Sequence, residues 1–232
     1  MLRSLVGSEM CIRDRYKDFL QATGLKQDEL TQVQLDSAED VLPSLDGFDG
    51  IIVGGSPFNI TDELHTPKQI HIMGQLRTLI ECELPSIFIC FGAGFVASEL
   101  GGTVGRTHPE ESGGTMVHLT EEGKKDPLLE SFPETFQALT GHTENITYLD
   151  PSCTLLAQSP TCPVQIFRYG KHTWATQFHA EMDPTSMRIR MNFYMDYGYF
   201  HKEDYDSIVA TLPSVDTTYS NGLLASFVRY CL

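Results

Sequence analysis

Two apolar runs that end in glycine-rich turns constrain the fold of this 232-residue chain more than any other feature. Residues 50–55 read GIIVGG and residues 88–94 read FICFGAG, so each run predicts a buried strand followed by a tight turn. A long amphipathic helix is expected between them, over residues 62–82, with its start delayed by Pro67. Because strands alternate with helices, we expect an α/β fold, with a mainly parallel open sheet and helices on both faces.

The rest of the chain predicts further strands and helices of the same domain. The expected elements are helices at residues 16–23 and 37–45, strands at 30–35, 116–119, 136–140, 153–157, 164–168 and 173–178, and helices after residue 183. No repeat, low-complexity tract or linker interrupts the sequence, so we expect residues 16–232 to form a single domain.

The first fifteen residues, MLRSLVGSEMCIRDR, need a separate interpretation. They lack the apolar core and the cleavage pattern of a signal peptide. They resemble the translation of sequencing-adapter read-through, which predicts that residues 1–15 are a non-native segment outside the fold. A short, genuine N-terminal arm is the alternative.

The net charge and the cysteine content limit which binding partners and which cellular compartment we expect. Lys and Arg number 16 against 31 Asp and Glu, a net charge of −15. Such a surface repels phosphate backbones and anionic lipid, so we expect neither nucleic acid nor a membrane surface as a partner. No apolar run approaches the roughly 20 residues of a membrane span. The six cysteines include no CxxC pair, which favours reduced thiols in a cytoplasmic protein over disulfides or a zinc site.

Cys90 is the first candidate for chemistry. It ends an apolar run and is followed by small residues and an expected helix. Such a strand-to-helix turn holds a side chain clear of the sheet, and the helix N-terminus favours a thiolate, so we expect a lowered thiol pKa. Considered alone, a cysteine at a strand end is more often a small buried apolar residue.

His179 and Glu181 form a second candidate pair at a later strand end. Residues two apart point to the same side of an extended chain, so the carboxylate can hold the imidazole in one tautomer. A single His-x-Glu is common by chance, but its combination with Cys90 predicts a nucleophile, a base and an orienting carboxylate. The turn at Gly54 and Gly55 frees N–H groups that, with the N–H of Phe91, can bind a developing oxyanion, although a plain tight turn is the alternative.

These features, in this order and spacing, resemble class I glutamine amidotransferase domains. That family has a glycine-rich oxyanion loop after a strand, a G-x-C-x-G-x-Q motif around its nucleophile and a late H-P-E. The matching segments are VGGSP at residues 53–57, FICFGAG at 88–94, QFHAE at 177–181, LGG at 100–102, DPLL at 126–129 and GHTE at 141–144. The stretch from residue 159 to 181 is similar to stand-alone proteins related to the amidotransferase domain of GMP synthase.

The resemblance implies a flavodoxin-like fold and release of ammonia from glutamine through a thioester on Cys90. His179 would be the acid and base, and Glu181 would orient it. It also implies a substrate that is glutamine or a related small amide. No synthetase segment fits in the remaining residues, so we expect an ammonia acceptor on a separate synthetase chain. The histidines show no spacing typical of metal ligands, so we expect no metal, and we expect no cofactor. His142, in a turn resembling the family's S-H-x-D/E, is a candidate for the substrate pocket or for a structural hydrogen bond.

Several departures from the family pattern leave alternatives open. Phe88 and Ala180 replace a glycine and the proline, and Gly94 stands where the family has the glutamine that helps hold the substrate. Gly94 therefore favours a second hypothesis, a cysteine hydrolase of a γ-glutamyl or related amide. A third is a catalytically silent binding subunit of a synthetase. The family also begins with a central strand where residues 1–15 stand here, so we expect the sheet to lack its first strand.

Overall fold

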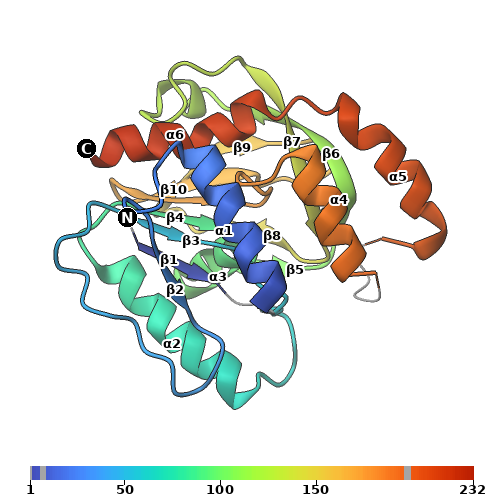
Figure 1. The fold of residues 1–232 in the computed structure, drawn as a ribbon. Coiled ribbons are helices and arrows are strands. Elements are labelled where there is room, and N and C mark those ends of the chain that lie inside the picture. Colours follow the sequence, from blue (N-terminus) through green and yellow to red (C-terminus); the bar gives the residue numbers. More distant parts are fainter. Residues whose placement is uncertain (1, 6–8, 196–199) are drawn as a thin grey trace.

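The computed structural model describes residues 2–5, 9–195 and 200–232, and its centre is a nine-stranded sheet (Figure 1). In spatial order its strands are β2 (Thr31–Gln34), β1 (Leu2–Leu5), β3 (Ile51–Val53), β4 (Ser86–Ile89), β11 (Thr173–Thr176), β10 (Ile166–Tyr169), β9 (Cys153–Gln158), β6 (Glu110–Leu119) and β7 (Thr135–His142). The first five run parallel, and the other four continue the sheet with antiparallel pairings. This arrangement confirms the expected α/β class.

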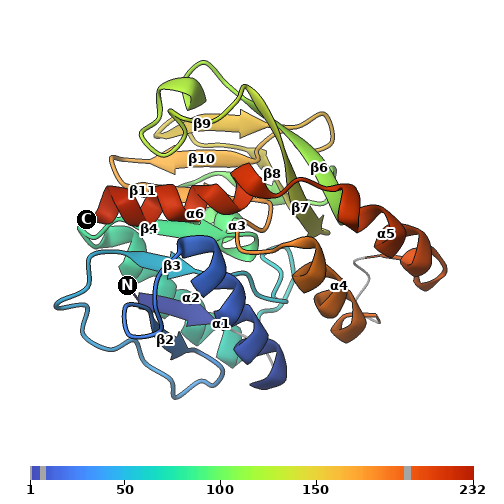
Figure 2. The same cartoon turned by 45° about the horizontal axis from the view of Figure 1, so that its top comes forward.

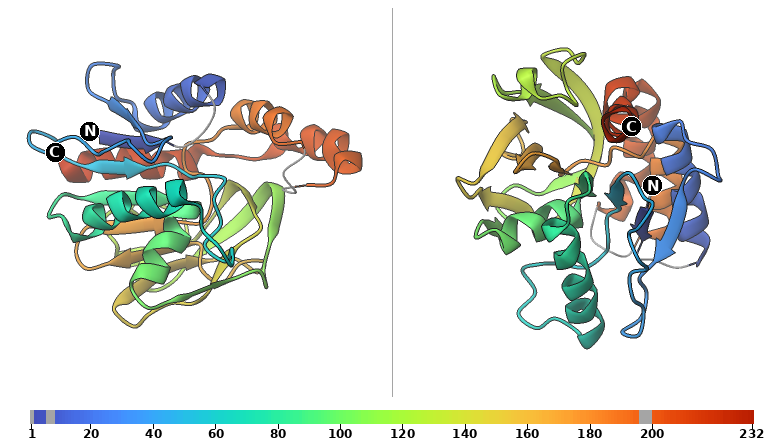
Figure 3. Two further views of the ribbon diagram at one scale, coloured as in Figure 1. Left: turned by 90° about the horizontal axis from the view of Figure 1, so that it is seen from below. Right: turned by 90° about the vertical axis from the view of Figure 1, so that its left-hand side faces the viewer.

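Helices cover both faces of the sheet (Figure 3). Ile52 and Ile87 point into one core with α1 (Glu9–Thr23) and α6 (Thr218–Cys231). Their neighbours in the chain, Ile51, Val53 and Phe88, point to the other face, into a second core with α2 (Pro67–Glu81) and α3 (Phe91–Glu99). Successive strand residues face opposite sides, so a strand that is buried on both faces needs apolar residues throughout, as the run IIV in β3 provides. Figure 2 shows α6 lying across one face of β4 and β11.

Two expected helices had different outcomes. The helix expected at residues 62–82 exists as α2, and its start is delayed as predicted, because Thr66 caps it and Pro67 is its first residue. The prediction of a helix at residues 37–45 was wrong, because this stretch forms no helix. Instead the Asp40 carboxylate accepts hydrogen bonds from the backbone N–H groups of Asp36 and Ser37, 2.6 and 2.7 Å away. Such local side-chain bonds compete with helical hydrogen bonds.

Strand β1 occupies the place where the sequence predicted a gap. It lies between β2 and β3 and pairs in parallel with both, Leu2 with Thr31 and with Ile51. The expected helix at residues 16–23 exists within the longer α1, which ends before Gly24 at a φ of +71°. Residues 2–5 therefore supply a central strand in this structure, whereas a non-native origin of residues 1–15 stays a prediction.

Three α-helices follow β11 in the described part of the chain: α4 (Pro184–Phe193), α5 (Tyr205–Thr211) and α6. α4 lies beside α1, whereas α6 lies across the sheet (Figure 1). A separate pair of short strands, β5 (Thr103–Gly105) and β8 (Asn145–Tyr148), was not expected from the sequence. None of the described helices combines the length and apolar character needed to cross a membrane. Because β3, β4 and β11 are parallel neighbours, the loops after them meet at one edge, where a ligand site is expected.

Candidate active site

Cys90 occupies the turn between β4 and α3. Its φ of +56° makes it the one non-glycine residue with positive φ in the described part of the chain. The backbone N–H of Cys90 donates to the Thr176 carbonyl at 2.7 Å, which fixes the turn against the end of β11. A left-handed conformation is costly for a residue with a side chain, and such strain is typical of functional turns. A Cβ added at Gly92 would lie 3.1 Å from the Phe88 side chain, so a residue without a side chain suits this close approach.

The expectation of a lowered pKa at Cys90 was wrong. Burial and the Glu181 carboxylate raise the pKa of this thiol to about 11, against smaller opposing effects of the Phe91 N–H and of two arginines. At neutral pH the resting side chain is therefore a neutral thiol. Since only the thiolate is a good nucleophile, Cys90 needs a nearby base to accept its proton.

His179 and Glu181 form a buried pair just after β11. The His179 Nδ1 atom lies 2.9 Å from the Glu181 Oε1 atom, and the Glu181 side chain is inaccessible to solvent. Burial works to raise the pKa of Glu181, but His179 and Arg190 outweigh it and hold the pKa well below its usual range. An ionised carboxylate can only accept, so Nδ1 carries the hydrogen and Nε2 is left as the basic nitrogen.

Arg190, on α4, completes a charged array that the sequence analysis missed. Two of its nitrogens lie 3.2 Å from the Glu181 Oε1 atom. Its guanidinium is also 4.0 Å from the Asp18 carboxylate on α1, whose pKa burial raises to about 6. Burial lowers the pKa of His179, Glu181 opposes this, and Arg190 adds to the lowering. His179 is therefore neutral at neutral pH, as a base for a thiol must be.

Gly55 lies next to the side chains of both Cys90 and His179. A Cβ added there would lie 3.1 Å from the His179 Cε1 atom and 3.3 Å from the Cys90 Cβ atom, so both side chains pack against the bare backbone of this residue. Phe91 directs its N–H at the Cys90 sulfur. Gly55 therefore lies beside the Cys90 side chain and Phe91 beside its sulfur, while their role as oxyanion donors stays a prediction. Gly54 is buried and is not among the residues that line either neighbouring pocket.

Cys90 lies at the boundary of two pockets. The first is also lined by Gly55, His179 and Arg190. The second is also lined by the other residues proposed for substrate binding: Phe91, Gly94 and His142. The structure therefore groups the sequence candidates on two sides of Cys90, with His179 on one side and Gly94 on the other.

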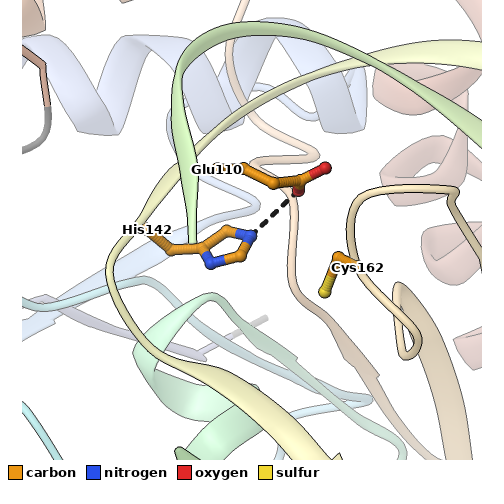
Figure 4. Close-up of side chains that lie close together, drawn as sticks. All are labelled: Glu110, His142 and Cys162. Carbon is orange, nitrogen blue, oxygen red and sulfur yellow. Dashed lines mark hydrogen bonds and ion pairs between the residues drawn. The ribbon is translucent and has the colours of Figure 1, made fainter. Parts of the chain in front are cut away.

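His142 is held by a buried carboxylate that the sequence analysis also missed (Figure 4). Its Nε2 atom lies 2.9 Å from the Glu110 Oε2 atom. The Glu110 carboxylate also accepts from the side chains of Thr115, Thr140, Ser159, Thr161 and Gln165. Burial alone would raise the pKa of Glu110, but these hydrogen bonds lower it to about 2. Nε2 must then donate to an ionised carboxylate, and the other ring nitrogen, Nδ1, is buried without a partner among the described residues.

Glu110, His142 and Cys162 bring three potential metal-ligand atoms within 4.8 Å of one another (Figure 4). The chemistry of this set does not favour a metal ion. The Glu110 oxygens are already occupied by six donors, and burial raises the pKa of Cys162 to about 12, whereas a ligating thiol must lose its proton. A hydrogen-bonded buried carboxylate accounts for the cluster.

A comparison of the sequence with models of known protein families identifies the family of this chain. A family model described as glutamine amidotransferase class-I matches residues 14–196, which is most of the chain. The chain belongs to the class I glutamine amidotransferase family. The matched range includes Cys90, His179, Glu181 and Arg190, so the whole charged array lies within the region that defines the family.

Individual relatives agree with this assignment. A glutamine-hydrolyzing GMP synthase subunit of Thermoplasma volcanium is 35% identical over 144 residues, which cover 61% of this chain and 66% of that relative. The glutamine-hydrolyzing GMP synthase of Porphyromonas gingivalis is 33% identical over 140 residues, which cover 60% of this chain but 26% of that protein. A solved glutamine amidotransferase from Thermotoga maritima superposes with a TM-score of 0.78 over 100% of this chain and 97% of its own, at 21% identity, and shows the shared fold.

Proposed function

We propose that this chain hydrolyses the side-chain amide of glutamine and releases ammonia through a thioester on Cys90. The observation that carries the proposal is the packing of Cys90 and His179 against the bare backbone of Gly55, with the far nitrogen of His179 bound to Glu181. In this proposal Cys90 is the nucleophile, His179 the base and Glu181 the orienting carboxylate of an acyl transfer. Membership of the class I glutamine amidotransferase family supports the same reaction.

In the first step the His179 Nε2 atom takes the proton of the Cys90 thiol as the sulfur attacks the amide carbon. A neutral imidazole is needed for this, and burial supplies it by lowering the pKa of His179. The tetrahedral oxyanion would be bound by the N–H groups of Gly55 and Phe91. When it collapses, His179 returns the proton to the nitrogen, ammonia leaves and the acyl group stays on sulfur.

In the second step water hydrolyses the thioester. His179, again neutral, takes a proton from water as the oxygen attacks the acyl carbon. The thiolate leaves and recovers its proton, which restores the resting enzyme. The raised pKa of Cys90, about 11, favours this reprotonation, so the resting pair is a neutral thiol and a neutral imidazole.

The acyl part of the substrate would lie in the pocket lined by Gly94 and His142. Glu144 lines this pocket too, but its carboxylate already accepts the backbone N–H groups of Ile60 and Thr61, both at 2.8 Å. His142 also lines this pocket, so we propose that its ring contacts the α-amino-acid end of glutamine. In this proposal His142 provides polar recognition where Gly94 provides none.

The ammonia acceptor would lie on a separate synthetase chain. The naming of a 35% identical relative as one subunit of GMP synthase supports this. That relative covers only part of this chain, so the identity of the acceptor stays a proposal.

Ammonia release from glutamine by the purified chain tests the function. The wild type should release ammonia, and Cys90→Ser should lose activity by several orders of magnitude. Cys153→Ser is a matched control, because Cys153 is a half-buried free cysteine on β9 that lines neither pocket. Equal turnover by wild type and Cys90→Ser would refute the proposal. No turnover by the folded wild type would instead favour a catalytically silent binding subunit.

A further inference from the structure

We infer that the pocket on the His179 side of Cys90 receives the leaving group of the substrate, and that this chain prefers γ-glutamyl amides of small apolar amines to glutamine itself. The inference rests on the proposed function, because it assumes that Cys90 is acylated. It begins from the position of Cys90 between two pockets of unlike composition.

Reaction geometry decides which pocket takes which half of the substrate. The nitrogen that leaves must be protonated by His179, so it has to lie on the side of the sulfur that His179 occupies. His179 lines the first pocket, whereas Gly94 and His142 line the second. An acyl group in the second pocket therefore directs any substituent on the leaving nitrogen into the first.

The wall of the first pocket extends beyond the reacting groups Cys90, His179 and Gly55. Much of its wall is apolar and comes from the segment that follows the candidate triad: Met182, Met187, Met191, Tyr194 and Phe200. Methionine side chains are flexible and polarizable, so they adapt to apolar groups of different shape.

The charged groups of this pocket do not select a charged leaving group. Arg190 lines the pocket, but its guanidinium already contacts the Glu181 carboxylate at 3.2 Å. Arg15 also lines it, and its guanidinium donates to the Gly55 carbonyl. These two cations disfavour a cationic amine, and the apolar side chains of the remaining wall suit an uncharged alkyl substituent.

The reaction remains the one proposed above, with a larger amine. The Cys90 sulfur forms a bond to the γ-carbonyl carbon, and the bond from that carbon to nitrogen breaks. The leaving nitrogen takes the proton that His179 accepted from the thiol and departs as a neutral primary amine. Water then cleaves the thioester to glutamate and the free thiol, so no oxidant, reductant or further reactant is needed.

Initial rates on a substrate series test the inference. The wild-type chain is assayed with glutamine and with γ-glutamyl methyl-, ethyl-, propyl- and n-butylamide, and glutamate is measured as the common product. Burial of each added methylene should raise kcat/KM about threefold to fourfold until the pocket is filled. Hydrolysis of glutamine with a flat or falling series would overturn the inference and leave the proposed function standing. If neither glutamine nor any amide is hydrolysed, both fail.

A variant that fills the pocket gives a second measurement. Met187→Trp should lower the ratio of kcat/KM for the n-butylamide to kcat/KM for glutamine about tenfold or more, because the indole would occupy space meant for the alkyl chain. Met195→Trp is the matched control, since Met195 is 36% exposed and does not line the pocket, and should leave the ratio unchanged. An unchanged ratio in folded Met187→Trp would place the leaving group elsewhere and overturn the inference.

Discussion

Replacing Glu110 by glutamine should destabilise the protein markedly, although Glu110 takes no part in the proposed chemistry. Burial opposes ionisation, but hydrogen bonds from His142 and its neighbours lower the pKa of Glu110 from 4.5 to about 2. A carboxyl shifted by this amount contributes about 3 kcal/mol to the free energy of unfolding. For a chain of this length that corresponds to a fall in Tm of about 6–12 °C.

The pH dependence of this effect has a definite sign. A carboxyl with a lowered pKa in the folded state contributes fully above pH 4.5, and the contribution is lost as the pH falls towards 2. The Tm difference between wild type and Glu110→Gln should therefore be largest at neutral pH and should narrow in acid. Glu110→Gln should also raise KM for glutamine, because the Nε2 atom of His142 loses its ionised partner.

Thermal melts at pH 7, 4.5 and 3 measure the effect. Glu111→Gln is the matched control, because it removes the same charge from the next residue of β6, whose side chain is exposed. The control should melt within about a degree of the wild type, since exposed substitutions are usually nearly neutral. Equal Tm values for Glu110→Gln and wild type at pH 7, or a difference that grows in acid, would refute this account of the buried carboxylate.

Three further outcomes are expected. His179→Ala should lose more activity than Glu181→Gln, because removing the base costs about 10²–10⁴ in rate, whereas an imidazole without its partner still adopts the right tautomer part of the time; the reverse order in folded variants would assign Glu181 another role. The profile of kcat/KM should fall in acid, with this limb below pH 6.5 because burial lowers the pKa of His179, and Arg190→Met should move the limb to higher pH; an acid limb unchanged by Arg190→Met would contradict an electrostatic role for this arginine. Replacing residues 2–5 with Gly-Ser-Gly-Ser should lower Tm and soluble yield, because β1 lies between two strands of the sheet. An unchanged Tm would mean that the sheet does not need this segment.

The parts of the site that could be predicted from sequence are those carried by local patterns. An apolar run followed by small residues marks a strand-to-helix turn, and an alternating pair at a strand end places two side chains on one side. Those patterns located Cys90, His179 and Glu181, and the fold then brought the loops after β4 and β11 together, as parallel neighbours must.

Residues without a local pattern escaped prediction. Arg190 and Glu110 are ordinary charged residues in sequence, and their roles depend on partners 9 and 32 positions away. The thiol pKa was predicted in the wrong direction, because the helix N-terminus is visible in the sequence while burial beside Glu181 is not. The central strand at residues 2–5 was missed since its apolar residues are few, and pairing with β2 and β3 places it in the sheet.

The most direct test of the central claim is the site of covalent labelling by a glutamine analogue that carries an electrophilic ketone in place of its amide. Incubation of the folded chain with this reagent, followed by peptide mass spectrometry, should find the adduct on Cys90, and excess glutamine should slow its formation. Cys90→Ala should take up no label at this site, while the free thiols of Cys82, Cys153, Cys162 and Cys231 stay unmodified. Labelling mainly on one of those four cysteines, or labelling of Cys90 that glutamine does not slow, would contradict the account.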